Sequence, residues 1–322
     1  MDQILTAAGV PLREDRRNVA GSVARGVLRF VRRKPLGAVG GAFVLLMLFC
    51  ALFADRQVVT AFQDHTPLLA PHYFDDQNLR DRLQGPSLAH PFGTDGLGRD
   101  QLSQIIYGAR VSLIVGLGAV FLAIALATAV GVVSGYVGGR FDMAVQRFVD
   151  SWIAFPAIVI LISAIQVAKA YIGDSAEAQT FAVILVLGVV LAAGASRVIR
   201  SSAIAIKGNL YVEAARTIGA TETRIVLRYI LPNVMAVIIV LATLQLGAAI
   251  LAEATVSFLG FGIPPPFPSW GRMLSTDGLL LMRRDPWLAF WPGFAIFLVV
   301  FGFNVLGDAL RDVLDPRLRG GR

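Results

Sequence analysis

The chain has 322 residues, of which 56% are hydrophobic and 16% are charged, and its mean hydropathy is +0.67. Ordinary soluble domains carry about a quarter charged residues, so a soluble fold of this size could not hide so much apolar surface. The formal net charge of +7 comes without a basic stripe interleaved with aromatic residues, which argues against a nucleic-acid partner. The composition predicts an all-α integral membrane protein in contact with the lipid bilayer.

Apolar runs long enough to cross a bilayer occur along most of the chain. Spanning the hydrocarbon takes about 20 helical residues, and the runs do not alternate with the period of two that a transmembrane β-barrel requires. About six transmembrane helices are therefore predicted. The runs are approximately Leu36–Ala54, Val111–Val137, Trp152–Ala168, Phe181–Ala195, Ile230–Ala252 and Trp287–Gly307.

The positions of Lys and Arg predict the orientation, because basic loops remain on the cytoplasmic side. If the N-terminus is inside, the cytoplasmic segments hold 20 of the 29 basic residues. Both termini are therefore predicted to be cytoplasmic. The predicted organisation begins with a cytoplasmic tail at 1–35, a first helix at 36–54 and a periplasmic segment at 55–110. A core transmembrane domain follows at 111–307, and a cytoplasmic tail ends the chain at 308–322. Within the core, a cytoplasmic loop is predicted at 196–231 and a periplasmic loop at 259–286.

Three glycines in and after the second run recur every four residues: Gly131, Gly135 and Gly139. This spacing places them on one face of a helix, where small residues let neighbouring backbones approach closely. Packing against another helix of the same chain is the favoured interpretation, and lining of a translocation pathway is the alternative.

The cytoplasmic segment 196–231 predicts a helix–turn–helix knob. Residues 209–218 are good helix formers, and Gly219 suits a left-handed stop after that helix. Thr221 can cap a second helix, which would project Ile225, Arg228 and Tyr229 before Pro232 re-enters the membrane. The knob is too short to bury its own apolar face, so it requires a partner.

Sequence motifs here resemble those of ABC-importer permeases. Glu213-Ala214-Ala215, followed by Gly219 and by Leu231-Pro232, is similar to the "EAA" loop, the coupling helix that docks into a groove on the ATPase subunit. Other motifs, in family order, resemble the C-type permease of the dipeptide/oligopeptide/nickel branch: His90–Asp100, Tyr107–Leu113, Gly135–Gly139, Ser257–Pro265, Pro268–Leu274 and Phe303–Arg319. No family signature is recognised in residues 55–89.

This resemblance implies the type I ABC-importer permease fold, with an added first helix before five core spans, in the bacterial inner membrane. The implied solutes are di- or oligopeptides, with nickel chelates or glutathione as alternatives. No cofactor is implied for this chain; ATP and Mg would lie on partner ATPases. The implied partners are a homologous B-type permease, two cytoplasmic ATPases and a periplasmic or lipid-anchored solute-binding protein. The implied ATPase-coupling residues are Tyr211, Glu213, Ala214, Ala215, Gly219, Ala220, Arg224 and Arg228.

Four residues are candidates for an outer gate or for contact with the binding protein: Arg99, Arg110, Glu253 and Trp270. For the two arginines, the default interpretation is anchoring at the outer interface. The more specific hypothesis is that they contact the binding protein when it docks. Glu253 lies about 31 Å beyond Pro232 at the helical rise, near the outer interface. A structural hydrogen-bonding role is favoured there over substrate contact, although intramembrane carboxylates are functional candidates.

The histidines of the outer segment are His65, His72 and His90. Their spacing lacks the compact pattern of structural metal sites, so ordinary loop histidines are favoured and no metal site is predicted.

Other classes of function are less consistent with the sequence. No phosphate-binding G-x4-G-K-[ST] loop occurs, so the energy must come from another subunit. A secondary transporter would show inverted repeats and midplane charges for ion coupling, and the predicted midplane is almost free of charge. An intramembrane enzyme would need a nucleophile, a dyad or a metal cluster within the spans, and we recognise none, so the chain is predicted not to be an enzyme.

Overall fold

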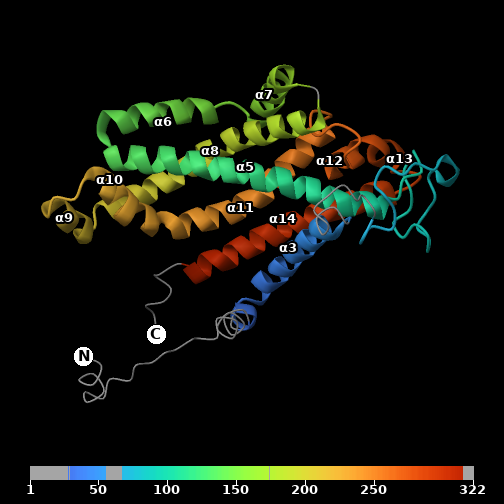
Figure 1. The fold of residues 1–322 in the computed structure, drawn as a ribbon, viewed down its shortest axis with the longest axis horizontal. Coiled ribbons are helices and arrows are strands. Elements are labelled where there is room, and N and C mark those ends of the chain that lie inside the picture. Colours follow the sequence, from blue (N-terminus) through green and yellow to red (C-terminus); the bar gives the residue numbers. More distant parts are fainter. Residues whose placement is uncertain (1–27, 29, 56–66, 174, 315–322) are drawn as a thin grey trace, which may run out of the picture.

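The structure is a computed structural model that describes residues 28, 30–55, 67–173 and 175–314. Helices dominate it (Figure 1), and within these ranges extended pairing is limited to two isolated bridges, Asp55–Pro67 and Thr94–Asp100. The longer helices are α3 (Pro35–Phe53), α5 (Gln101–Val137), α6 (Gly139–Ile153), α7 (Ala157–Ile172), α8 (Ala176–Lys207), α11 (Leu231–Phe258) and α14 (Trp287–Leu314). The shorter ones are a 3₁₀ turn (Leu79–Asp81), α9 (Leu210–Thr217), α10 (Glu222–Ile225), a π-helical turn (Val226–Ile230), α12 (Trp270–Met273), a second π-helical turn (Leu274–Gly278) and α13 (Leu279–Leu281).

Five helical stretches of the described chain are long and apolar enough to cross a membrane, and a bent pair makes a sixth. The prediction of an all-α membrane protein with about six spans is thus confirmed. Many side chains on these helices find no cover within the chain; Phe121, for example, is 79% exposed. Such residues face lipid or another subunit.

Several spans are longer than their apolar runs, and α5 and α8 show why. Helix α5 begins at Gln101 because the side chain of Asp100 caps it, accepting a hydrogen bond from the backbone N–H of Ser103 at 2.8 Å. Helix α8 continues through residues 196–207, which the sequence assigned to a loop. Its polar end is stabilised by an ion pair of Arg200 with Asp142 on α6. The length of the apolar run alone therefore underestimates the length of both helices.

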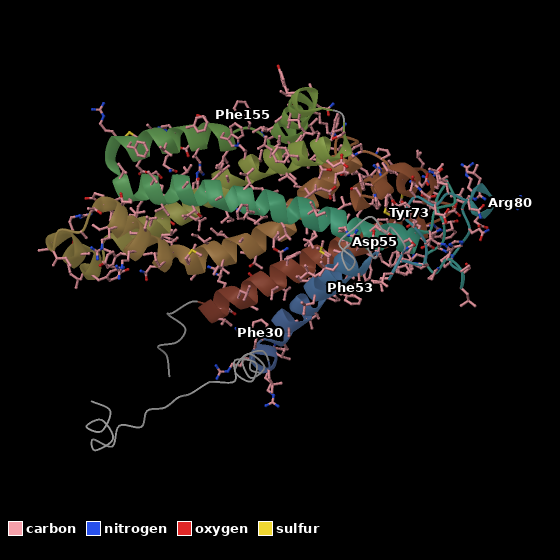
Figure 2. The ribbon with its side chains drawn as sticks, in the orientation of Figure 1. Phe30, Phe53, Asp55, Tyr73, Arg80 and Phe155 are labelled. Carbon is pink, nitrogen blue, oxygen red and sulfur yellow. The ribbon has the colours of Figure 1, made fainter. Side chains whose placement is uncertain are left out.

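The third predicted span, Trp152–Ala168, is not one continuous helix. Helices α6 and α7 meet at an angle of 90° around Pro156, near the label of Phe155 in Figure 2. Proline has no N–H to donate, and its ring disfavours a helical conformation in the preceding residue. The prediction of a single helix over this run was wrong because the Phe155-Pro156 step breaks it.

Helix α5 packs closely against α8, and glycines contribute to the contact at the end of the pair near the knob. A Cβ atom placed on Gly131 would lie 2.6 Å from the backbone oxygen of Ser196, and one on Gly135 would lie 2.9 Å from that of Arg200. The packing interpretation is confirmed for these two glycines. Gly139 differs: it has a positive φ of 59° after the break at Gly138, and nothing lies within 4 Å of its Cβ position.

Helices α3 and α14 run side by side (Figure 1), and an ion pair joins Lys34 Nζ to Asp312 Oδ2 at 2.6 Å. The start of α3 and the end of α14 therefore lie together. Helices α9 and α10 occupy one end of the molecule in Figure 1. The opposite end carries the segment 67–100 with α12 and α13, where Figure 2 labels Tyr73 and Arg80.

Candidate coupling site

The knob predicted between α8 and α11 is present. Helix α9 follows the end of α8 at Gly208 and stops before Gly219, whose φ is +82°. A residue with a Cβ is strained at this φ. Thr221 then caps α10 by accepting a hydrogen bond from Arg224 N at 3.4 Å. The helix, the left-handed glycine and the cap all lie where the sequence predicted them.

One face of the knob points inward. Val212, Ala215 and Ile225 are nearly or fully buried, and Ala220 packs against the same cluster, which is built from α5, α8, the knob and α11. Ile225 was expected to project from the second helix together with Arg228 and Tyr229. In the structure Ile225 is fully buried, and α10 has four residues and passes directly into the π-helical turn Val226–Ile230.

The other face of the knob is open. Leu210 is 83% exposed and Ile218 is 82% exposed. The remaining predicted coupling residues are also exposed: Tyr211, Glu213, Ala214, Gly219, Arg224 and Arg228. Two large apolar side chains thus lie exposed on the tip of the knob.

Tyr136, near the end of α5, holds the knob in place. Its hydroxyl hydrogen-bonds the carboxylate of Glu222 on α10 and accepts a hydrogen bond from Arg216 of α9 at 3.3 Å. The backbone oxygen of Tyr136 accepts a hydrogen bond from Lys207 Nζ at 2.6 Å. The Tyr136 hydroxyl is the main reason why the pKa of Arg216 is raised. These contacts fasten both knob helices to α5.

Sequence reasoning did not single out Tyr136. The only signal was its place in the Gly135–Gly139 motif, which carries no information about a partner on α10. A tyrosine at the polar end of a long apolar helix is also typical of simple interfacial anchoring. The spatial proximity of residues 136 and 222 reveals its role.

Glu253 and Trp270 are built into the opposite end of the molecule. Glu253 is fully buried and accepts hydrogen bonds from Ser257 at 2.7 Å and Ser269 at 2.9 Å, with Ser112 at 3.5 Å. Trp270 is 2% exposed and donates to the backbone oxygen of Ile105 at 3.1 Å. These contacts favour the structural interpretation of Glu253 over direct contact with solute, and they hold Trp270 inside the fold.

Both outer arginines form internal ion pairs. Arg110 makes a two-pronged contact with Asp55 at 3.0 and 3.2 Å and also donates to Ala51 O at 2.7 Å. Arg99 Nε donates to Asp95 Oδ2 at 2.7 Å. Arg272 holds the loop 259–286 by donating to Ile263 O at 2.9 Å. Burial, then repulsion from Arg99, lowers the pKa of Arg272. The arginines thus anchor the outer end.

A hollow of about 670 Å³ opens beside the Arg110–Asp55 pair, between α5, α8 and the outer loops. Aromatic rings form much of its wall, with Glu177 as a further charged side chain.

A family model for the "binding-protein-dependent transport system inner membrane component" matches residues 127–320. The chain belongs to this family. A second model, for the "N-terminal TM domain of oligopeptide transport permease C", matches residues 22–86. This match corrects the expectation that residues 55–89 carry no family signature, because short motifs are too sparse there to be recognised individually.

Two relatives resemble this permease over most of its length. The dipeptide transport system permease protein of Alkalihalophilus pseudofirmus is 38% identical over 295 residues, covering 92% of this chain and 90% of the relative. The glutathione transport system permease protein of Escherichia coli is 38% identical over 292 residues, covering 91% and 90% respectively. The predicted resemblance to C-type permeases of the dipeptide/oligopeptide branch is confirmed.

Family membership establishes the general role. The chain is a multi-pass protein of the bacterial inner membrane and a non-enzymatic permease subunit of an ABC importer. Such a permease works with an ATPase, a permease partner and a solute-binding protein. The helices described above are consistent with the type I importer fold.

Proposed function

We propose that this permease forms half of a translocation pathway for di- or oligopeptides and that the knob formed by α9 and α10 transmits ATPase closure to the membrane helices. The exposed pair Leu210 and Ile218, on a tip fastened to α5 by Tyr136, carries the proposal. A cytoplasmic ATPase with a complementary groove would cover both side chains.

The proposed assembly contains a homologous B-type permease, two cytoplasmic ATPases and a periplasmic or lipid-anchored binding protein. ATP and Mg lie on the ATPases, and this chain binds no nucleotide. ATP binding closes the ATPase pair and pushes the knob. Tyr136 and the packed α5–α8 pair carry that movement toward the outer end, and the two permeases alternate between outward and inward access.

The proposed solute class rests on the relatives, one named for dipeptides and the other for glutathione. Glutathione is itself a tripeptide, so short peptides are the chemistry that both share. Glutathione is therefore the alternative solute, and nickel chelates are a further one.

Replacing either exposed side chain of the knob by aspartate tests the coupling role. Ile218→Asp and Leu210→Asp should weaken retention of the ATPase by at least tenfold, about 1.4 kcal/mol or more, because a charge would be buried in an apolar contact. The measurement is co-purification from detergent together with solute-stimulated ATP hydrolysis. Leu88→Asp is the matched control, since Leu88 is fully exposed on the opposite end of the molecule.

The control should assemble and hydrolyse ATP as the unmodified complex does. Normal ATPase retention and import by both knob variants would overturn the coupling assignment. The solute is tested separately, by melting of the co-purified binding protein with dipeptides and with glutathione, because a bound ligand raises the melting temperature. Stabilisation by glutathione alone would replace the peptide proposal with its alternative.

A further inference from the structure

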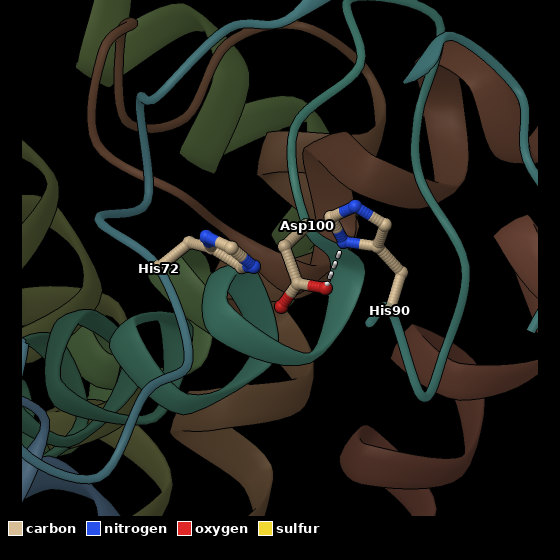
Figure 3. Close-up of side chains that lie close together, drawn as sticks. All are labelled: His72, His90 and Asp100. Carbon is tan, nitrogen blue, oxygen red and sulfur yellow. Dashed lines mark hydrogen bonds and ion pairs between the residues drawn. The ribbon is translucent and has the colours of Figure 1, made fainter. Parts of the chain in front are cut away.

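His72, His90 and Asp100 come together at the start of α5 (Figure 3). One potential ligand atom from each lies within 4.8 Å of the other two. His90 Nδ1 is 3.0 Å from Asp100 Oδ1, and the centroids of the two imidazole rings are 5.1 Å apart. The spacing of the histidines in the sequence did not predict this proximity, because both lie in an irregular segment whose path only the structure gives.

Asp100 is held in a fixed orientation. Its Oδ2 accepts hydrogen bonds from the backbone N–H and the hydroxyl of Ser103, both at 2.8 Å. Its Oδ1 is therefore the oxygen turned toward His90, and its side chain is 1% exposed. A carboxylate fixed at a helix terminus by hydrogen bonds to one oxygen is a pre-organised ligand through the other.

The same serine also positions His72. Ser103 Oγ accepts a hydrogen bond from the backbone N–H of His72 at 3.0 Å. The side chain of His90 is 12% exposed, and His72 is half-buried. The group thus lies just beneath the outer surface of the protein, where an ion could enter from solution and most of its ligands would be shielded.

We infer that His72, His90 and Asp100 bind a divalent transition-metal ion of the Zn²⁺ type. Two imidazoles and a carboxylate are ligands that Zn²⁺ accepts, and two ligands of a tetrahedral zinc ion lie about 3.3 Å apart. The separation of His90 Nδ1 and Asp100 Oδ1 is close to that value. His90 binds through Nδ1 as its Nε2–H tautomer, and rotation of the His72 ring brings the third ligand to the ion.

The ion would join three separate stretches of the outer end. His72 and His90 belong to different parts of the segment 67–100, and Asp100 caps α5, which packs against α8 and α11. Three protein ligands leave one position for water. The consequence is a metal clamp that fixes the periplasmic segment on the longest helices of the fold.

The alternative is that His90 simply donates a hydrogen bond to Asp100 while His72 contacts its ring. His72→Phe separates the two interpretations, because phenylalanine keeps a ring beside His90 and leaves the His90–Asp100 hydrogen bond intact but removes a metal ligand. His90→Phe is a second variant. Asp76→Asn is the matched control, since Asp76 is an exposed carboxylate close to His72 that lies outside the group.

The experiment uses full-length permease, purified in detergent through a tag without histidine, together with the subunits that accompany it. The sample is stripped with EDTA and titrated with Zn²⁺ in a calorimeter and with Co²⁺ by visible absorption. The unmodified permease and the Asp76→Asn variant should each bind one more ion per permease chain than the His72→Phe variant binds. The His72→Phe protein should bind at this site at least tenfold more weakly and should lose the Co²⁺ absorption band.

Zn²⁺ should also raise the melting temperature of the unmodified protein but not that of His72→Phe, because an ion that binds only the folded state stabilises it. If His90→Phe fails to assemble, His72→Phe decides the matter alone. Equal Zn²⁺ stoichiometry and affinity in the unmodified and His72→Phe proteins would overturn the proposal. So would the absence of Zn²⁺ binding by both.

Discussion

At the scale of single residues, Tyr136 connects the membrane helices to the knob. Its hydroxyl contacts Glu222 and Arg216, which belong to different knob helices. Tyr136→Phe removes both contacts and leaves the ring, the α5 backbone and the Lys207 hydrogen bond in place. We expect the ATPase to remain bound while import per ATP hydrolysed falls several-fold, because the knob can move without α5.

Transport and ATP hydrolysis measured together in proteoliposomes check this expectation. Glu222→Gln is a useful companion, because an amide can still meet the tyrosine hydroxyl and should retain more coupling than Tyr136→Phe. Unchanged import per ATP in Tyr136→Phe would show that this hydroxyl has no part in transmission.

The Arg110–Asp55 pair gives a second prediction for single residues. Asp55 is 2% exposed, and both terminal guanidinium nitrogens of Arg110, Nη1 and Nη2, donate to it. Removing one partner of a buried pair leaves an uncompensated charge, which costs about 3–5 kcal/mol. Asp55→Ala should therefore lower the melting temperature in detergent by several degrees, and Asp55→Ala combined with Arg110→Met should recover much of the loss. Equal melting temperatures for the unmodified protein, the single variant and the double variant would contradict a stabilising role for the pair.

At the scale of elements, the close packing of α5 on α8 depends on glycine. Gly131→Ala would place a methyl group 2.6 Å from the Ser196 backbone oxygen, whereas nothing lies within 4 Å of the Cβ position of Gly194 on α8. Forcing the packed helices apart costs about 1–3 kcal/mol. Alanine at an open helical position stabilises by about 0.5–1 kcal/mol.

The same substitution should therefore act in opposite directions at the two sites. Thermal melting in detergent should fall for Gly131→Ala and remain equal or rise for Gly194→Ala. Destabilisation of similar size by both variants would indicate that the helix contact inferred from Gly131 is not what limits stability.

At the scale of the whole molecule, the sequence predicted the helical class, the number of spans and the knob, because apolar length, Gly219 and Thr221 are local signals. It missed the 90° bend, since apolarity continues through Pro156 while the helix does not. It also placed a loop at 196–207, because Arg197 and Arg200 interrupt the apolar run but pair with Asp150 and Asp142 on α6.

The candidate sites likewise include residues that local sequence signals reveal and residues that only the folded structure reveals. The proposed coupling residues between Tyr211 and Arg228 follow from a contiguous motif and could be named in advance, whereas the exposed Leu210 and Ile218 were not named from the sequence. Tyr136 and the His72–His90–Asp100 group depend on segments that are distant in sequence and meet only after folding. The contacts of Glu253 with Ser112 and Ser269, which lie on other elements, were equally out of reach of a local pattern.

The central claim is that the knob faces the cytoplasm and lies under an ATPase. The direct measurement is maleimide labelling of Ile218→Cys in a Cys50→Ala background, since Cys50 is the single native cysteine. A membrane-impermeant reagent should leave intact cells unlabelled. It should label inverted vesicles stripped of ATPase, and label them several-fold less once the ATPase is restored. Rapid labelling from outside intact cells, or labelling that the ATPase does not reduce, would contradict the account.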